Sequence, residues 1–351
     1  MSVAEKSWKF ADILASKEIS ARFEQVRRWF FLRESTYDMT NRCNIRCEGC
    51  YYYHGDKQFA PENGDPAAWQ ALMAAEKARG VTFVVLAGAE PALVPELCRE
   101  CYGVIPLGAI ATNGLKKIAK DIDYRLHISV WGNDITSRTL RGAADMLKRQ
   151  IENYQNDARA VFVYTFTPAN IAEAARVAET LTRHGLKMTF NMFSAPVGYT
   201  GPLRHNAASL AATAAMMRQL LRRFPETVLF SHYNIAAHTN AQGLHELFTC
   251  SYPRRNPSTA VGLGRSFRQY RADLNWDRAA ACCVPDTDCT DCRHYAAGSA
   301  VVTARMYRHA ENPQLFSAWL DYVDTYLAVW VKGYEKSANL LDSLVKPPTA
   351  G

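Results

Sequence analysis

The chain lacks any run of about 18 consecutive apolar residues, which excludes an ordinary transmembrane helix. It also lacks a secretory signal, because its first residues have neither a long apolar core nor a cleavage pattern of small residues. No internal repeats and no low-complexity tracts occur. We therefore expect a cytoplasmic globular protein with no membrane partner.

A strong charge of one sign is missing as well. The 41 basic and 34 acidic residues leave a formal charge of +7, which is too mild and too dispersed to indicate a nucleic-acid partner. One segment is locally basic, with Arg254, Arg255, Arg265, Arg268, Arg271 and Arg278. Two interpretations remain open for it: a solvated or cluster-supporting surface, or a grip on an anionic group of a substrate.

Cysteine is plentiful by contrast, with 10 residues in the chain. In a chain without a secretory signal this favours metal binding or redox chemistry in a reducing compartment over disulfides. Cys43, Cys47 and Cys50 have the spacing C-x3-C-x2-C. Three thiolates so close together can bind three irons of a 4Fe–4S cube and leave the fourth iron open. A zinc knuckle, with His54 as a distant fourth ligand, and simple buried thiols are the alternatives.

Apolar alternation predicts strands at Ser35–Met39, Val81–Ala87, Ile105–Thr112, Arg125–Val130, Val161–Thr165 and Lys187–Met192. Helical patterns between them span residues 66–79, 91–101, 114–120, 136–154 and 170–184. This alternation predicts an α/β fold with a parallel sheet, namely a partial (β/α)6 TIM-type barrel. Active residues in such barrels gather at the C-terminal strand ends, and the three cysteines follow the first strand directly.

The flanking regions suggest five parts. We expect an N-terminal helical segment (1–34), the barrel core (35–200), a helical continuation of the core (201–249), an irregular Cys-rich extension (250–298) and a C-terminal helical segment with a tail (299–351). The last part contains an apolar stripe that runs from Phe316 to Trp330, which is expected to be core or a dimer face.

The cysteine spacing resembles the signature of the radical S-adenosylmethionine (radical SAM) superfamily. The resemblance covers about residues 35–195 and extends to later strand ends. Gly88-Ala89-Glu90-Pro91 resembles the Gly-Gly-Glu-Pro motif, with Ala89 in place of the second Gly. It implies that Gly88 and Glu90 receive the methionine amine of SAM.

The same resemblance implies further contacts with SAM. Asn113 lies in a Thr-Asn-Gly sequence typical of the third strand end, and Ser129 matches a serine near the ribose and carboxylate. Asn191 is expected near the adenosyl group, and Tyr52 beside the adenine. Gly49 stands where the family often has an aromatic residue, so an aromatic contact has to come from elsewhere. His127 shares a strand face with Ser129 and is interpreted as a core histidine.

A second metal site is expected farther along the chain. Its preferred ligands are Cys250, either Cys282 or Cys283, Cys289 and Cys292, and they resemble the auxiliary-cluster extensions called SPASM or Twitch without matching their spacing. A second 4Fe–4S cluster is preferred, with structural zinc as the rival. Cys98 and Cys101 share a helical face and are interpreted as buried core residues.

The resemblance implies an enzyme that cleaves SAM reductively to a 5′-deoxyadenosyl radical, with flavodoxin or ferredoxin as the reductant. We expect a small-molecule substrate, polar or anionic, in a secondary-metabolite pathway. About 34 residues before the first strand are too few for a leader-binding domain, yet a peptide-modifying enzyme remains the alternative. A non-catalytic iron–sulfur carrier, a zinc-stabilised binding protein and a methyltransferase are the other open readings.

Overall fold

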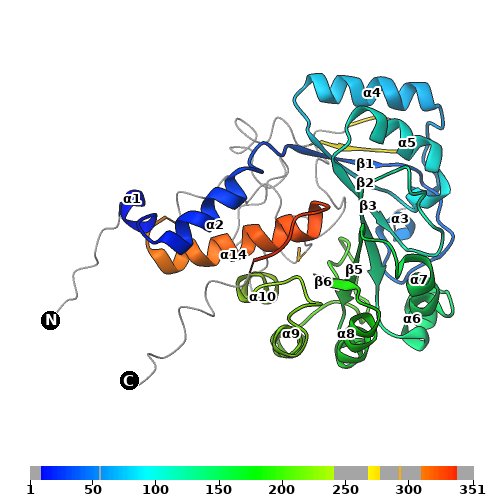
Figure 1. Cartoon of the computed structure of the whole chain (residues 1–351). Helices are drawn as coiled ribbons and strands as arrows, with labels where there is room; N and C mark the ends of the chain where they lie inside the picture. Colours follow the sequence, from blue (N-terminus) through cyan, green and yellow to red (C-terminus); the bar gives the residue numbers. More distant parts are fainter. Residues whose placement is uncertain (1–8, 55–56, 241–267, 277–291, 294–309, 338–351) are drawn as a thin grey trace.

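A single parallel sheet organises the protein (Figure 1). The computed structural model describes residues 9–54, 57–240, 268–276, 292–293 and 310–337. Within them the strand order is β6-β5-β4-β3-β2-β1-β7, with every pair parallel. The strands are β1 (Glu34–Asp38), β2 (Phe83–Ala87), β3 (Gly108–Thr112), β4 (Arg125–Val130), β5 (Ala160–Phe166), β6 (Lys187–Met192) and β7 (Gln269–Tyr270). The predicted α/β class and its six strands are confirmed.

Helices connect the strands, and most of them cover one face of the sheet (Figure 1). They are α3 (Tyr51–His54), η1 (Lys57–Phe59), α4 (Pro66–Ala78), η2 (Pro91–Leu93), α5 (Pro95–Val104), α6 (Asp134–Arg141), α7 (Met146–Tyr154), η3 (Ile171–Glu173), α8 (Ala174–Arg183), α9 (Ala207–Arg223) and α10 (His232–Thr239). On this outer face Val84 and Leu86 are buried in a core that includes Trp69 of α4 and Leu97 of α5.

The inner face of the sheet has a second core. Phe83 and Val85, which alternate with the outer residues of β2, pack with Trp319 and Trp330 of α14 (Pro313–Trp330). Helix α2 (Lys17–Arg27) lies beside α14 (Figure 1), and α1 (Phe10–Ile13) precedes it. The apolar stripe of the C-terminal segment is therefore core within this chain, and a dimer face is not needed to bury it.

The end of α14 is fixed to the start of β4. Arg125 donates from Nε to the carbonyl oxygen of Val329 at 3.1 Å and from Nη1 to that of Ala158 at 3.2 Å. His127 Nε2 lies 2.9 Å from the same Val329 oxygen, so this nitrogen carries the hydrogen. Burial lowers the pKa of His127 to about 3. The interpretation of His127 as a satisfied core histidine is confirmed.

A buried ion pair joins the N-terminal and C-terminal helices. Arg22 donates to Asp321 and to Asp324, each at 2.8 Å, and the three side chains are at most 9% exposed. Removing one partner of such a buried pair typically costs about 3–5 kcal/mol. The predicted N-terminal helical segment thus forms two helices, α1 and α2, and it is part of the fold.

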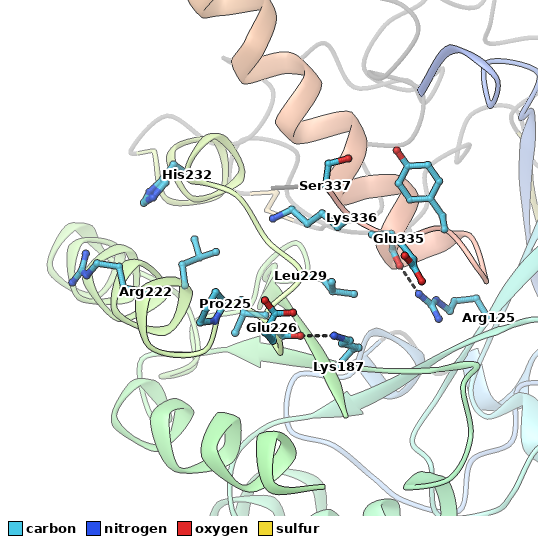
Figure 2. Close-up of a pocket in the computed structure, with 14 residues that line it drawn as sticks. Arg125, Lys187, Arg222, Pro225, Glu226, Leu229, His232, Glu335, Lys336 and Ser337 are labelled. Atoms are coloured by element: carbon cyan, nitrogen blue, oxygen red, sulfur yellow. Dashed lines mark hydrogen bonds between the residues drawn. The ribbon is translucent and has the colours of Figure 1, made fainter. Parts of the chain in front are cut away.

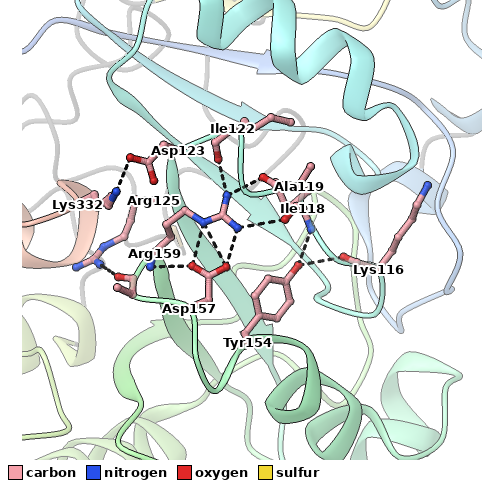
Figure 3. A network of polar contacts seen from close by, with 11 residues as sticks. Lys116, Ile118, Ala119, Ile122, Asp123, Arg125, Tyr154, Asp157, Arg159 and Lys332 are labelled. Atoms are coloured by element: carbon pink, nitrogen blue, oxygen red, sulfur yellow. Dashed lines mark hydrogen bonds and ion pairs between the residues drawn. The ribbon is translucent and has the colours of Figure 1, made fainter.

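The helix predicted over residues 114–120 is wrong, because the segment between β3 and β4 is irregular (Figure 3). The Tyr154 hydroxyl accepts the N–H of Ile118 at 3.1 Å and donates to the carbonyl of Lys116 at 3.0 Å. The Arg159 guanidinium, paired with Asp157, donates to the carbonyls of Ile118, Ala119 and Ile122. Distant side chains therefore satisfy backbone groups that a helix would have satisfied internally.

Other predicted bounds need correction. The single helix over residues 136–154 is two helices, because Gly142 with φ 68° and Asp145 with φ 52° adopt the left-handed conformation between α6 and α7. The helix over residues 91–101 divides into η2 and α5, and that over 170–184 into η3 and α8. Strands β2 and β3 begin two and three residues later than predicted, at Phe83 and Gly108.

Strand β7 was absent from the prediction, because two residues in an arginine-rich segment carry no periodic signal. It pairs with β1 through Thr36–Gln269 and Tyr37–Tyr270. Two arginines of that segment support this edge of the sheet: Arg268 lies 3.7 Å from Glu76 and Arg271 lies 3.2 Å from Asp38. The other four lie outside the described residues.

The described helices include none that is both long enough and apolar enough to cross a membrane.

Candidate active site

The three clustered cysteines lie in the loop that follows β1, at the C-terminal edge of the sheet. The loop is attached to the end of β2: Met39 donates its N–H to Ala87 at 3.0 Å, and Ala89 donates to Thr40 at 2.9 Å. Gly88 has φ +107°, and a Cβ there would lie 2.7 Å from the Met39 nitrogen. The predicted glycine position is therefore one that only glycine suits, because backbone approaches it closely.

Glu62 holds the start of this thiol loop, which we define as residues 39–50. One carboxylate oxygen accepts the Thr40 hydroxyl at 2.7 Å and the Asn41 N–H at 2.9 Å, and the other lies 2.9 Å from Arg42 Nε. Burial alone would raise the pKa of Glu62, but these hydrogen bonds and the Arg42 charge outweigh it and lower that pKa. An ionised carboxylate thus fixes the direction in which the chain leaves β1.

All three thiols line one pocket of about 250 Å³. Cys43, Cys47 and Cys50 are free and partly exposed. Burial raises the pKa of Cys43, and it raises that of Cys50 to about 11. Thiols of raised pKa are poor nucleophiles at neutral pH, whereas a bound cationic centre deprotonates them outright. The pocket therefore suits metal ligation better than thiol catalysis.

The donor set fits an iron–sulfur cluster. Among the described residues, no three His, Cys, Asp or Glu side chains converge in the way that a single metal ion requires. The thiols instead surround a shared space, where each can bind a different iron of a 4Fe–4S cube. The described residues that line the pocket include three sulfur ligands and no Asp, Glu or His, which also agrees with that cofactor. This arrangement favours the cluster over the zinc knuckle.

The ends of four neighbouring strands form the opposite wall of the pocket. Asn113, Ser129 and Asn191, all predicted from the sequence, line it together with Thr165, which was not predicted. Asn191 Nδ2 lies 3.5 Å from Thr165 Oγ1. Because strands in a parallel sheet end at the same edge, residues far apart in sequence meet here.

Asn113 links this wall to the thiols. Its Nδ2 lies 3.7 Å from Cys43 Sγ and donates to Asn44 Oδ1 at 2.6 Å. N–H groups that point at cluster sulfurs stabilise the reduced cluster and tune its potential.

Glu90 lies behind the pocket wall and does not line the pocket. Its side chain is 1% exposed, and its oxygens accept the Thr112 hydroxyl at 2.6 Å and the N–H groups of Asn113 at 2.7 Å and Ala92 at 3.0 Å. Burial raises the pKa of Glu90 although these hydrogen bonds oppose the shift. The role expected for Glu90 toward the SAM amine stays a prediction. The observed hydrogen bonds show that Glu90 holds the backbone of Asn113 in place.

Arg141 is a pocket residue that the sequence did not reveal. It is the one Lys, Arg or His side chain among the described residues that line the pocket. Its Nε lies 3.4 Å from Cys47 Sγ, and its Nη1 donates to the carbonyl of Ser129 at 2.5 Å. The residue ends α6 and is 3% exposed. No periodicity or motif distinguishes it from Arg138 one turn earlier.

Aromatic rings complete the pocket. Tyr52, predicted from the sequence, is 3% exposed and lines it, as do Trp131 and Phe193. Phe193 directly follows β6, and its ring packs on Gly49 of the thiol loop. The sequence left this aromatic contact open, and the fold supplies it from a residue 144 positions away (193 minus 49).

The predicted second metal site is described only at Cys292; Cys250, Cys282, Cys283 and Cys289 lie outside the described residues. The neighbour of Cys292, Arg293, donates its N–H to Ser194 Oγ at 2.9 Å, and Ser194 lines the thiol pocket. The Arg293 guanidinium donates to the carbonyls of His238 at 2.9 Å and Asn240 at 2.6 Å. Cys292 is thus held beside the same pocket.

The remaining thiols belong to the core. Cys98 and Cys101 are both 0% exposed, and burial raises the pKa of each well above its ordinary value. Their interpretation as buried core residues is confirmed.

A larger cavity of about 900 Å³ lies at the opposite end of the sheet (Figure 2). Its described lining residues include no cysteine, and they carry both charges, including Arg125, Lys187, Glu226 and Glu335. Lys187 donates to the carbonyl of Glu226 at 2.5 Å, as Figure 2 shows. Although Glu226, His232 and Glu335 line it, no three His, Cys, Asp or Glu side chains converge among the described residues, so the smaller thiol pocket is the candidate active site.

Comparisons with known proteins agree with this site. No protein-family model matches the chain. An S-adenosylmethionine-dependent nucleotide dehydratase from Thermoplasmatales archaeon (strain ISO4-H5) is 24% identical over 163 residues, which are 46% of this chain and 52% of that protein. The sporulation killing factor maturation protein SkfB of Bacillus subtilis (strain 168) is 26% identical over 164 residues, 43% of this chain and 40% of SkfB. The matches thus span about half the length of these relatives.

Solved structures show the same fold. Streptococcus suis SuiB bound to S-adenosylmethionine superposes with a TM-score of 0.52 at 13% identity, over 88% of this chain and 72% of SuiB. SuiB bound to precursor peptide SuiA gives a TM-score of 0.51, also at 13% identity, over 90% of this chain and 73% of SuiB. At such identity the likeness concerns the fold alone. In the thiol motif, in the related sequences and in its fold, the chain is thus similar to radical SAM enzymes, whose cofactors are a 4Fe–4S cluster and S-adenosylmethionine.

Proposed function

We propose that the protein cleaves SAM reductively in the thiol pocket and uses the resulting 5′-deoxyadenosyl radical to take a hydrogen atom from a small organic substrate. The observation that carries this proposal is the convergence of Cys43, Cys47 and Cys50 with Asn113, Ser129 and Arg141 around one pocket. A carrier of electrons alone has no need of the polar wall that the strand ends provide. That wall therefore speaks against a simple iron–sulfur carrier.

The cofactors, when bound, supply the electron and the radical, and the residues of the chain bind, orient and shield them. Cys43, Cys47 and Cys50 hold three irons. Arg141 is suited to the carboxylate of SAM, because a guanidinium offers a planar fork of N–H donors that matches it. After its bonds to Cys47 and Ser129, donors of its five N–H groups remain for a ligand.

Asn113 and Arg141 also tune the reduction potential of the proposed cluster. Each directs an N–H group toward a different thiol sulfur, at 3.7 Å and 3.4 Å. Such donors spread the negative charge that the cluster gains when it is reduced. Flavodoxin or ferredoxin is our proposed source of the electron.

The substrate class we favour is a small polar or anionic molecule. The related nucleotide dehydratase supports it, because that protein is named for a small anionic substrate. A precursor peptide is the second candidate, supported by the likeness in fold to SuiB bound to precursor peptide SuiA. Arg268 and Arg271, which the sequence analysis offered as anion contacts, face Glu76 and Asp38 instead, so these two do not support the small-molecule candidate.

Detection of 5′-deoxyadenosine tests the reaction. Protein reconstituted without oxygen is mixed with SAM and dithionite, and the products are separated by chromatography. We expect 5′-deoxyadenosine from the wild type, none from Cys47→Ala, and an unchanged amount from Cys98→Ala, a matched control at a buried thiol outside the pocket. Equal yields from wild type and Cys47→Ala would remove the thiols from the reaction.

The same assay distinguishes the substrate candidates. Nucleoside triphosphates and short synthetic peptides are added in turn, and deuterium at their carbon atoms is traced into 5′-deoxyadenosine. Transfer from a nucleotide supports the small-molecule substrate, and transfer from a peptide alone replaces it with the second candidate.

A second 4Fe–4S cluster is proposed at Cys250, Cys282 or Cys283, Cys289 and Cys292. The position of Cys292 beside the thiol pocket supports it, because a cluster there can accept the electron that remains after hydrogen abstraction. About eight irons per chain are expected, falling to about four in the Cys43/Cys47/Cys50 triple Ala variant. About four falling to none would leave zinc or free thiols at the C-terminal cysteines.

A further inference from the structure

A small aromatic cluster, separate from the two main cores, packs against the thiol loop. It consists of Trp131, Phe193, Ala195, Tyr199 and Leu203. Trp131 follows β4, and the other four follow β6, so the cluster lies at the C-terminal edge of the sheet. Its large side chains are well covered, with Trp131 9% exposed and Phe193 and Tyr199 each 7% exposed. No reaction step in the proposed function uses them.

Phe193 is seated directly on Gly49, between Cys47 and Cys50. A Cβ atom at Gly49 would lie 2.6 Å from Phe193 Cζ and 2.9 Å from Phe193 Cε2, far inside van der Waals contact. Gly49 also has φ +65°, which disfavours any side chain. Glycine at this position therefore leaves room for the ring of Phe193.

The ring is held firmly in place. Phe193 continues the pairing of β5 with β6, since its N–H donates to the carbonyl of Phe166 at 2.9 Å. Its ring makes edge contacts with Trp131 at 6.0 Å and Tyr199 at 5.4 Å between centroids. A side chain supported by sheet backbone and by two further rings is a rigid contact.

A second contact reinforces the first. The Tyr199 hydroxyl donates to Glu48 Oε1 at 3.4 Å, and the N–H of Glu48 donates to the carbonyl of Leu140 at 2.7 Å. Residues 48 and 49 of the thiol loop are thus fixed by elements that follow β4 and β6.

We propose that Phe193, seated on Gly49, is the positioning residue that closes the thiol loop over Cys50 and keeps water and dioxygen from the iron–sulfur site. This inference rests on the proposed function, because it requires a cluster at the three thiols. The hydrophobic surroundings of a metal site control solvent access and hence its stability toward oxidation. Dioxygen would be the oxidant: it would take one electron from the bound cluster and become superoxide, and the oxidised cluster would then release an Fe2+ ion.

The experiment compares wild type with Phe193→Ala, Phe193→Leu and Phe59→Ala. Phe59 is the matched control, because it is 80% exposed and lies in η1, soon after the same cysteines. Each protein is reconstituted without oxygen, its iron is counted, and the cluster absorbance is followed after transfer to air-saturated buffer. No SAM and no substrate are added, so the readout is independent of activity.

We expect Phe193→Ala to lose its cluster about tenfold faster than wild type, the lower end of what changes around metal ligands cause. Phe193→Leu, which conserves much of the volume, stays close to wild type, and Phe59→Ala equals it. Failure of Phe193→Ala alone to retain iron during reconstitution supports the inference as well. Equal rates of loss for Phe193→Ala and wild type overturn it.

Combining Gly49→Ala with Phe193→Ala makes the test specific to the contact between these two residues. Gly49→Ala forces the ring away and accelerates cluster loss. Adding Phe193→Ala then causes little further loss, because the two changes disrupt the same contact and are not additive. Fully additive effects overturn the inference. A wild type that binds no iron refutes the proposed function instead, so the two failures are distinguishable.

Discussion

Glu90 accepts the backbone N–H of Asn113 at 2.7 Å, and the side-chain amide of Asn113 in turn reaches Cys43 Sγ at 3.7 Å. A residue of the strand-to-helix turn after β2 therefore acts on the first thiol through a residue of the strand end after β3. The family motif assigns Glu90 to the SAM amine, whereas the contacts connect it through Asn113 to the Cys43 thiol.

Glu90→Gln distinguishes these two roles. The amide replaces one acceptor oxygen with an NH2 group that faces N–H or O–H donors, and leaving such buried donors unsatisfied costs about 1–3 kcal/mol each. We expect less iron per chain after reconstitution in the absence of SAM. Glu96→Gln, at an exposed position in the first turn of α5, is the control. Full iron content with weakened SAM binding would support the role carried over from the family instead.

Arg141→Ala is expected to weaken the binding of SAM. Loss of a charge-assisted hydrogen bond costs about 1.5–3 kcal/mol, or roughly 10- to 150-fold in affinity. Isothermal titration of the reconstituted protein with SAM measures this loss. 5′-Deoxyadenosine, which lacks the carboxylate, should bind both proteins alike. The control is Arg138→Ala, an exposed arginine one turn earlier on α6. An equal loss for both ligands would place Arg141 away from the carboxylate.

Two buried histidines predict acid lability. Burial lowers the pKa of His127 to about 3 and that of His238 to about 4. The unfolded chain binds protons at these residues below about pH 6.5, while the folded chain does not, so stability falls as the pH falls from 6.5. Each histidine adds a slope of up to about 1.4 kcal/mol per pH unit.

Urea unfolding between pH 7.5 and pH 5 measures that slope. His127→Gln should be less stable at neutral pH, since it loses packing in the inner core, yet its stability should depend less on pH. His184→Gln, at an exposed position after α8, should keep the wild-type slope. Identical slopes for all three proteins would contradict a neutral His127 in the folded state.

Arg159→Ala should destabilise the fold without touching the thiol pocket. The guanidinium pairs with Asp157 at 2.6 Å and satisfies the carbonyls of Ile118, Ala119 and Ile122, as Figure 3 shows. Its removal leaves the Asp157 carboxylate, which is only 12% exposed, and three carbonyls without this partner, and we expect a cost of about 3 kcal/mol.

Urea unfolding tests this expectation as well. Arg149→Ala, at an exposed position on α7, is the control and should change the free energy of unfolding by less than about 0.5 kcal/mol. If Arg159→Ala lowers the free energy of unfolding by less than about 1 kcal/mol, the irregular segment 114–120 keeps its conformation without the guanidinium.

The strands of the barrel could be predicted because their sequences alternate or are continuously apolar, and the bounds of β4 and β6 match the prediction. The thiol loop could be predicted because iron–sulfur ligation imposes a fixed spacing. The segment 114–120 could not, because its conformation depends on Tyr154 and Arg159, which lie outside any local window.

Local sequence patterns also fail to reveal those site residues that depend on tertiary contacts. Asn113, Ser129 and Asn191 were found through strand-end motifs, whereas Arg141 and Phe193 carry no local signal that separates them from ordinary helix and loop residues. Their positions become visible only once α6 and β6 are folded beside the thiol loop. Residues that act through tertiary contacts therefore need a structure, and residues that act as ligands often need only a spacing.

Helix α14 covers the N-terminal half of the inner sheet face, and the thiol pocket uses the C-terminal half of that same face. Among the described residues, α14 therefore fills the N-terminal half of this face and leaves the C-terminal half to the pocket. We expect the proposed cofactor and substrate to bind on this same half of the face, so that the molecule that binds deeper binds first and leaves last. In steady-state kinetics, SAM should therefore bind first in an ordered mechanism. Substrate bound above SAM should slow the dissociation of SAM.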